Sequence, residues 1–207
     1  MMHNDLLRSM LATYDPDGKC YGVVVGIVTN NRDPDNMHRV KVRFPWLNQN
    51  DESNWARVAN PMAGNGRGIY FLPEVDDEVL VAFEHGSIEH PYVVGSLWNG
   101  KDQPHESNSD GSNDNRSIKS RSGHVIRLCD KSGSESIEII DKSGNNKIVI
   151  CTSGNKILVE AMGDIEITSQ TGNIKLSAIG IELKAQANVD VTANAQVNIK
   201  GTLVNIN

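Results

Sequence analysis

The side chains able to do chemistry are few in this 207-residue sequence, and they are scattered along it. Metal sites in proteins take three or four His, Cys, Asp or Glu ligands at close and regular spacing. His85 and His90 flank a glycine-containing turn without a third ligand at suitable spacing, and the cysteines, Cys20, Cys129 and Cys151, form no CxxC pair. We therefore predict no metal site, and reduced thiols in a protein made in the cytoplasm.

Two loops partly match phosphate-binding and calcium-binding motifs. The run GSLWNGK at 95–101 fits GxxxxGK, but Asp102 stands where the motif needs a magnesium-binding Ser or Thr. The run NRDPDN at 31–36 spaces its acids as a calcium loop does, but it lacks the glycine at the sixth position, and Val42 replaces the glutamate at the twelfth. Both runs are interpreted as connections between strands, and we expect no cofactor.

Three further runs raise the question of catalysis or anion binding. PEVDDEV at 73–79 holds adjacent carboxylates, SRSGH at 120–124 holds serines and a histidine, and GNGRG at 64–68 is a flexible loop able to cradle an anion. A nucleophilic serine needs a histidine base and an acid that orients the base, and no such acid can be assigned here. We interpret the three runs as turns and loops, predict no catalytic residue, and expect a non-enzymatic protein.

The elements that carry these residues fall into two parts of different composition, and we call these parts the two plans of the chain. All ten aromatic residues lie at or before Trp98, and all seven prolines lie at or before Pro104. Residues 1–117 carry seventeen Asp and Glu against ten Lys and Arg, and the formal charge of the chain is −6, which disfavours a nucleic-acid surface. The sequence predicts neither a transmembrane helix nor a secretory signal.

The first plan comprises three segments. Four apolar residues at helical spacing predict a short amphipathic helix in residues 1–18. Residues 19–98 contain five or six short apolar or alternating runs separated by Gly, Pro, Asn and Asp, which predicts a small Greek-key barrel such as an OB-fold. Residues 99–117 hold almost no apolar side chain and are predicted to be a polar linker.

The second plan, in residues 118–207, is a repeat. Four apolar bursts are separated by Ser, Gly and Asn turns as far as Gly163. From 181 to 203 every odd position is apolar or glycine, and two large residues alternate with two small ones, which gives an eight-residue repeat. Alternation with period two places the large residues on one face of a strand, and the small pair marks a corner.

One octad cannot close a coil around a core, whereas three octads supply the twenty or more residues that a coil needs. Three identical chains, each supplying one side, would close the coil. The predicted fold is therefore all-β, an OB-fold-like barrel followed by an intertwined, homotrimeric triple-stranded β-helix needle. The predicted trimer core consists of Ile165, Ile167, Ile174, Leu176, Ile181, Leu183, Val189, Val191, Val197, Ile199 and Leu203. An ordinary antiparallel β-meander is the alternative, although the 181–203 alternation contains no paired-glycine or Asn-Gly hairpin turn.

Several runs of the sequence resemble a known family. The runs PEVDDEVLVAFEHG and KSRSGH carry the most specific similarity, within a match that covers roughly residues 19–207. The family comprises the phage baseplate assembly protein V and VgrG spikes, the central spikes of contractile phage tails, type VI secretion systems and related extracellular injection particles. The resemblance implies an OB-fold domain followed by a trimeric β-helix.

The sequence also departs from some members of that family. It has no cell-wall-cleaving domain between barrel and needle, only about twenty residues before the barrel in place of a large hub domain, and no His-x-His pair near its end. We therefore expect the hub to be a separate protein at the barrel end. The apolar phase shifts at Val204 and Ile206, which predicts that Val204, Asn205, Ile206 and Asn207 contact a PAAR-type tip protein.

The resemblance implies a structural function. We expect a central spike that works with tail tube and baseplate components at the tip of a phage tail-like particle, is delivered extracellularly or to a target cell envelope, and pierces that envelope. One alternative is an OB-fold module that binds carbohydrate or nucleic acid on a β-helical stalk. Another is a β-helical polysaccharide-cleaving enzyme, which would need longer coils and a carboxylate cluster that the sequence lacks.

Overall fold

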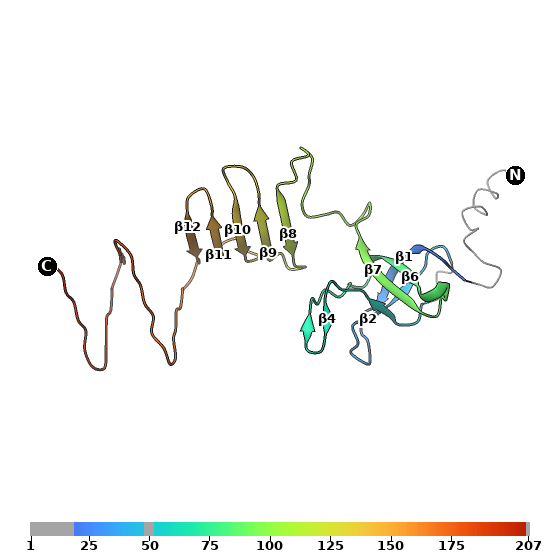
Figure 1. Ribbon diagram of the computed structural model, residues 1–207, viewed down its shortest axis with the longest axis horizontal. Helices are drawn as coiled ribbons and strands as arrows, with labels where there is room; N and C mark the ends of the chain where they lie inside the picture. The colour runs from blue at the N-terminus through green and yellow to red at the C-terminus, as the bar shows by residue number, and fades with distance from the viewer. Residues whose placement is uncertain (1–18, 48–51, 206–207) are drawn as a thin grey trace.

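The computed structural model describes residues 19–47 and 52–205. Within these residues the chain is all-β, apart from one 3₁₀ turn, η1, at Glu84–Gly86. A barrel is followed by a five-stranded sheet and then by a zigzag segment (Figure 1). None of the described residues forms a helix that could cross a membrane. The helix predicted for residues 1–18 lies outside the described residues.

Five strands close the barrel in the order β1-β2-β3-β7-β6. Their bounds are Val23–Asn30 for β1, Arg39–Arg43 for β2, Ala56–Val58 for β3, Glu78–Phe83 for β6 and Pro91–Leu97 for β7. Neighbouring strands are antiparallel except for β3 and β7, which are parallel. A separate hairpin of β4 (Ala63–Gly64) and β5 (Arg67–Gly68) projects from the barrel on the side of the sheet (Figure 1). The predicted small closed barrel is confirmed.

Small β-branched side chains fill the barrel. β2 and β6 alternate buried with partly exposed positions, so every second residue turns inward. The buried core consists of Cys20, Val28, Val40, Val42, Phe44, Ala56, Val79, Val81, Phe83 and Val93. At Gly26 a Cβ atom would meet the side chains of Phe44 and Val81 at 3.3 Å, so a larger residue there would force this core apart.

The sheet that follows is an antiparallel meander in which each strand pairs with the next along the chain. Its strands are β8 (Asn115–Lys119), β9 (Val125–Cys129), β10 (Ser136–Ile140), β11 (Lys147–Cys151) and β12 (Lys156–Glu160). The first strand thus begins within the segment expected to be linker.

This meander differs from the intertwined helix that we expected from residue 118 onward. Over residues 115–160 the structure has the antiparallel meander that was the alternative. The physical reason lies in the turns. Gly123, Gly133 and Gly144 adopt the left-handed backbone region, with φ of 105°, 76° and 76°, and this conformation reverses the chain tightly enough for successive strands to pair with each other.

The zigzag segment after β12 has no strand pairing among the residues described, which end at 205. Its backbone bends at 162–163, 170–172, 179, 186–187, 194–195 and 202, so successive bends lie about eight residues apart. Two of these bends fall at the Ala185/Ala187 and Ala193/Ala195 pairs, where the sequence placed corners. Figure 1 shows the resulting path as a series of extended arms.

Candidate functional site

One face of the β8–β12 sheet is made of large aliphatic side chains that nothing in the described chain buries. Strand register places them in two rows across the sheet. The first row is Ile118, Ile126, Ile139, Ile148 and Val159, and the second is Leu128, Ile137, Ile150 and Ile157. We call these nine residues the aliphatic face. Each of them is at least 43 % exposed, although an antiparallel sheet normally keeps such a face against a core.

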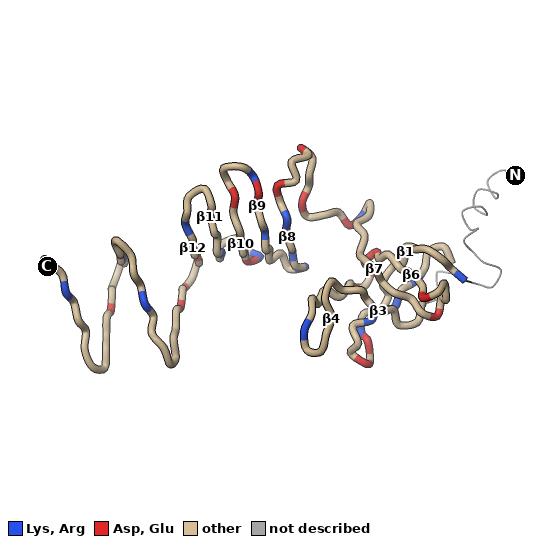
Figure 2. Tube along the Cα trace, viewed as in Figure 1, with Lys and Arg blue, Asp and Glu red and all other residues tan. Residues whose placement is uncertain are grey.

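The opposite face of the same sheet carries the charges. Arg127 lies between two carboxylates, 3.3 Å from Glu106 and 3.4 Å from Glu138, and Lys147 lies 2.7 Å from Glu160. Figure 2 shows Lys, Arg, Asp and Glu along these strands and few of them in the zigzag segment. The sheet is therefore amphipathic, with one face suited to water and one suited to an apolar partner.

The residues predicted as trimer core line the zigzag segment, and the single chain does not bring them together. All eleven are exposed, from Ile165 to Leu203. Val204 and Asn205, predicted as tip contacts, are also exposed, whereas Ile206 and Asn207 lie outside the described residues. Removing apolar surface from water is favourable by roughly 25 cal/mol for each Å² buried. A partner that covers a surface of this extent is therefore favoured.

Sequence reasoning missed the aliphatic face, although it identified the apolar bursts that contain it. Ile140, Val149 and Leu158 point to the charged face, so β10, β11 and β12 carry apolar residues on both faces, at three or four of their five positions. Without a clear period of two, the pattern does not say which face is apolar. The strand register was needed to sort these residues into rows.

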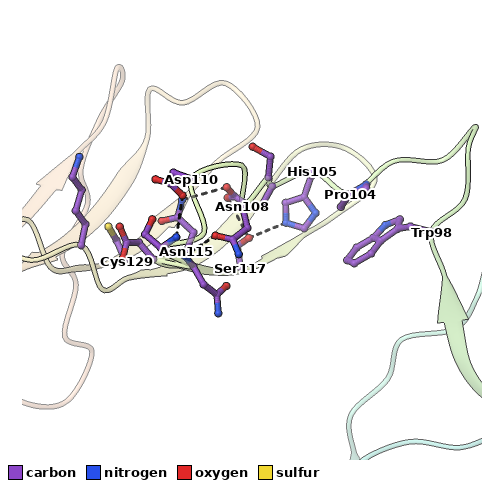
Figure 3. Close-up of a pocket in the computed structure, with 14 residues that line it drawn as sticks. Trp98, Pro104, His105, Asn108, Asp110, Asn115, Ser117 and Cys129 are labelled. Carbon is purple, nitrogen blue, oxygen red and sulfur yellow. Dashed lines mark hydrogen bonds between the residues drawn. The ribbon is translucent and has the colours of Figure 1, made fainter.

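A polar pocket of about 540 Å³ lies where residues 98–115 fold against β8 and β9 (Figure 3). His105 Nε2 is 2.8 Å from Ser117 Oγ, and Ser117 Oγ is 3.3 Å from Glu106 Oε1. In a catalytic triad the carboxylate orients the histidine through its other ring nitrogen. Here the carboxylate accepts a hydrogen bond from the serine instead, so these contacts hold the segment on the sheet and do not activate the serine.

The acids of the 31–36 loop are engaged by an arginine. Arg39 donates from Nε and Nη2 to the two Asp33 oxygens at 2.9 and 2.6 Å, and the backbone amides of Asp35 and Met37 also donate to Asp33. The Arg39 hydrogen bonds hold the pKa of the Asp33 carboxyl well below its ordinary value. The lone pairs that a calcium ion would need are therefore already used, and the described residues contain no cluster of three potential metal ligands.

The other candidate loops form local turns. In the 73–79 run, Asp77 accepts a hydrogen bond from the Glu74 amide at 2.8 Å. In the 120–124 run, Ser120 Oγ accepts from the His124 amide at 3.0 Å, which closes the turn between β8 and β9. The GNGRG run is the β4–β5 hairpin. In all three runs the hydrogen bonds stabilise a reversal of the chain.

Comparisons with known proteins agree with the barrel assignment. Residues 24–98 match the family described as the type VI secretion system/phage-baseplate injector OB domain. The type VI secretion system spike protein VgrG1a of Pseudomonas aeruginosa is 30% identical over 139 residues, which cover 61% of this chain and 22% of that protein. The spike protein VgrG3 of Vibrio cholerae is 37% identical over 86 residues, which cover 40% of this chain and 8% of that protein.

A third relative has an activity in its name. The actin cross-linking toxin VgrG1 of Vibrio cholerae is 33% identical over 92 residues, or 42% of this chain and 8% of that protein. The matched part of this chain thus spans between 8% and 22% of the length of these three relatives.

Proposed function

Since the chain belongs to the VgrG and phage-baseplate V family of injection-system proteins, we propose that it is the structural central spike of a contractile injection apparatus, whether a phage tail, a type VI secretion system or a related extracellular device. The barrel would seat the spike on a hub and tail tube. The segment after the barrel would form the needle that pierces the target cell envelope. The chain would be made in the cytoplasm, assembled at the tip of the particle, and delivered to the outside.

The observation that carries this proposal is the uncovered apolar surface that follows the barrel. It comprises the aliphatic face of residues 115–160 and the exposed apolar side chains of residues 164–203, from Ile165 to Leu203. Three copies related by a three-fold axis can turn both surfaces inward. The sheets would then form the three walls of a prism, and the octads would continue it as the intertwined β-helix.

The needle would be stiff because its backbone groups must pair between chains. The zigzag segment has no hydrogen-bonded ladder within the described chain, and unpaired strand edges readily pair with other strands. Stacked strands lie about 4.7 Å apart, so each octad arm would be fixed by arms of the neighbouring copies. Folding and trimer formation would be coupled in this segment.

A structural role fits the chemistry of the site. The Glu106 carboxylate accepts a hydrogen bond from Ser117 and does not orient His105. The acids of the 31–36 loop are paired with Arg39. The cross-linking activity in the name of one relative is not proposed for this chain, which covers 8% of that protein. The proposed partners are two further copies, a hub protein at the barrel, and a PAAR-type tip protein on residues 204–207.

The test is a pair of aspartate substitutions in adjacent positions of one octad. Val191→Asp would place three carboxylates together near the three-fold axis, where unpaired buried charges cost several kcal/mol each. Thr192→Asp adds the same charge at an even, outward position. Native mass spectrometry should show a trimer for the wild type and for Thr192→Asp, and a monomer for Val191→Asp. A monomeric wild type, or equal trimer in both variants, would refute the inward assignment.

A further inference from the structure

A groove of about 790 Å³ with a mostly apolar lining lies between the barrel and the sheet. Its floor is the first row of the aliphatic face, which runs across all five strands. Its wall is formed by Phe71 and Leu72, in the stretch that follows the β4–β5 hairpin. Charged side chains stand around it, and Arg121 Nη1 and Glu74 Oε2, 2.7 Å apart, join barrel and sheet.

Phe71 has an unusual position within this wall. Tyr70 on one side is held by His38, with ring centroids 4.5 Å apart, and Leu72 on the other side packs against the barrel core. Phe71 itself is 61 % exposed. Tyr70 is itself 74 % exposed, so the barrel leaves two neighbouring aromatic rings uncovered, and Phe71 is the one that lines the groove. Uncovered aromatic side chains of this size are enriched where proteins bind partners.

The floor of the groove identifies the class of partner. A small-molecule site needs a few polar groups that converge to orient the ligand. Here the interior is aliphatic, and the floor continues without a boundary into the second row, Leu128, Ile137, Ile150 and Ile157. The groove is therefore the barrel-side margin of the aliphatic face, and whatever covers that face also covers the floor.

We propose that the aliphatic face of a second copy enters this groove, so that Phe71 of one copy packs against the sheet of its neighbour. This inference rests on the proposed trimer and adds a contact that the octads do not supply. A residue of the barrel would become part of the needle interface. The contact would fix the orientation of each barrel relative to the needle, and it would let force pass from barrel to needle through packed side chains as well as through the covalent segment 99–114.

The experiment measures the reactivity of a cysteine placed at the wall. Phe71→Cys is labelled with a maleimide in the full-length chain, and peptide mass spectrometry separates its rate from those of the natural cysteines. The same substitution is made in the Val191→Asp chain as the monomeric reference. Val23→Cys, on the outer surface of β1, is the control in both backgrounds, because Val23 is exposed and lies outside the groove.

Labelling at position 71 should be about tenfold slower or more in the trimer than in the monomer, since a buried thiol reacts only after local opening. Labelling at position 23 should be equal in both. Equal rates at 71 in trimer and monomer would overturn the proposed contact while leaving the trimer intact. Slow labelling in both would overturn it too, because the chain would then cover the groove by itself.

A second variant separates the contact from folding. Phe71→Ser should remain a trimer by native mass spectrometry, because the octads and the aliphatic face are unchanged. Limited proteolysis of the 99–114 segment should become several-fold faster, since the barrel would lose its packed contact with the needle and keep only the segment itself and the exposed Arg121–Glu74 ion pair. A trimer whose 99–114 segment is cut at the wild-type rate would overturn the proposal, and so would a monomeric wild type, which would also remove the trimer itself.

Discussion

Valine occupies the core of the barrel and the octad positions that we propose face the trimer axis, but with opposite surroundings. Val81 in β6 is 0 % exposed, because five strands of the same chain close around it. Val191 in an octad is 66 % exposed, because no other part of the described chain comes near it. The residue type and the alternation are the same in both places. What differs is whether one chain can close a surface around the side chain.

The meander occupies an intermediate position between these two regions. Its backbone is satisfied within one chain, since β8 to β12 pair in succession, but its aliphatic face is not. The barrel therefore completes both backbone pairing and apolar burial, the meander completes only the pairing, and the octads complete neither. Mutations in these regions should therefore differ in whether they affect the fold of the single chain or its assembly with other copies.

The largest effect should come from a charge on the aliphatic face. Ile157 in β12 is 71 % exposed, so Ile157→Asp should leave the single chain unharmed, while it places three carboxylates in the interior of a trimer. We expect loss of the trimer in sedimentation velocity. Lys156→Asp, next to it on the opposite face, is the matched control and should remain trimeric. If both variants sediment like the wild type, the aliphatic face is not an interface.

The next effect should come from the barrel core. Val81→Ala removes two buried methyl groups and leaves a cavity, which should lower the free energy of unfolding of the barrel by about 2 kcal/mol. Urea denaturation followed by tryptophan fluorescence measures this change. Val94→Ala, at an exposed position of β7, should change it by less than about 0.5 kcal/mol.

The same experiment sharpens the contrast with the needle. The barrel closes within one chain and meets its neighbour only at the proposed Phe71 contact, so the midpoint of the Val81→Ala transition should depend on protein concentration far less than the needle transition does. A barrel midpoint that rises with concentration as steeply as the needle midpoint would show that partner copies hold the barrel together.

A smaller effect should follow from the ion pair in the 31–36 loop. Hydrogen bonds from Arg39 lower the folded-state pKa of Asp33, so the ionised carboxylate stabilises the barrel. This contribution is complete above the unfolded pKa of about 3.9 and is lost as the pH falls through the lower folded pKa. Asp33→Asn should therefore lower the Tm at neutral pH and flatten its fall below about pH 4.

The control for this titration is Asp35→Asn, which removes the more exposed of the two carboxylates that pair with Arg39. It should lower the Tm less than Asp33→Asn does. If the two variants and the wild type lose stability in parallel as the pH falls, Asp33 does not contribute to the acid sensitivity.

The smallest effect should come from the ion pair between barrel and sheet. The Arg121 side chain is mostly exposed, and exposed pairs of this kind contribute about 0–1 kcal/mol. A double-mutant cycle of Arg121→Ala and Glu74→Ala should give a coupling energy within that range, and the coupling should decrease with added salt. A coupling above about 2 kcal/mol would mean that the pair is desolvated.

The sequence predicted the barrel because its signals are local. Short alternating runs separated by Gly, Pro, Asn and Asp specify strands and turns, and five such strands with inward valines leave few ways to close. Sequence also marked two of the bends after residue 160, which fall at the small pairs Ala185/Ala187 and Ala193/Ala195. It did not predict that residues 115–160 would pair within one chain.

The sequence by itself determined which residues alternate and where two of the corners fall, and it predicted turns at 31–36, 73–79 and 120–124. Only the tertiary structure decided which face of the meander is aliphatic, because register sorts Ile139 from Ile140 and periodicity does not. It also decided that Phe71 lies beside the first row of the aliphatic face, because the groove is formed by segments that are distant in the chain. Alternation is a property of neighbours along the backbone, whereas closure of a surface depends on contacts between segments that the backbone does not link.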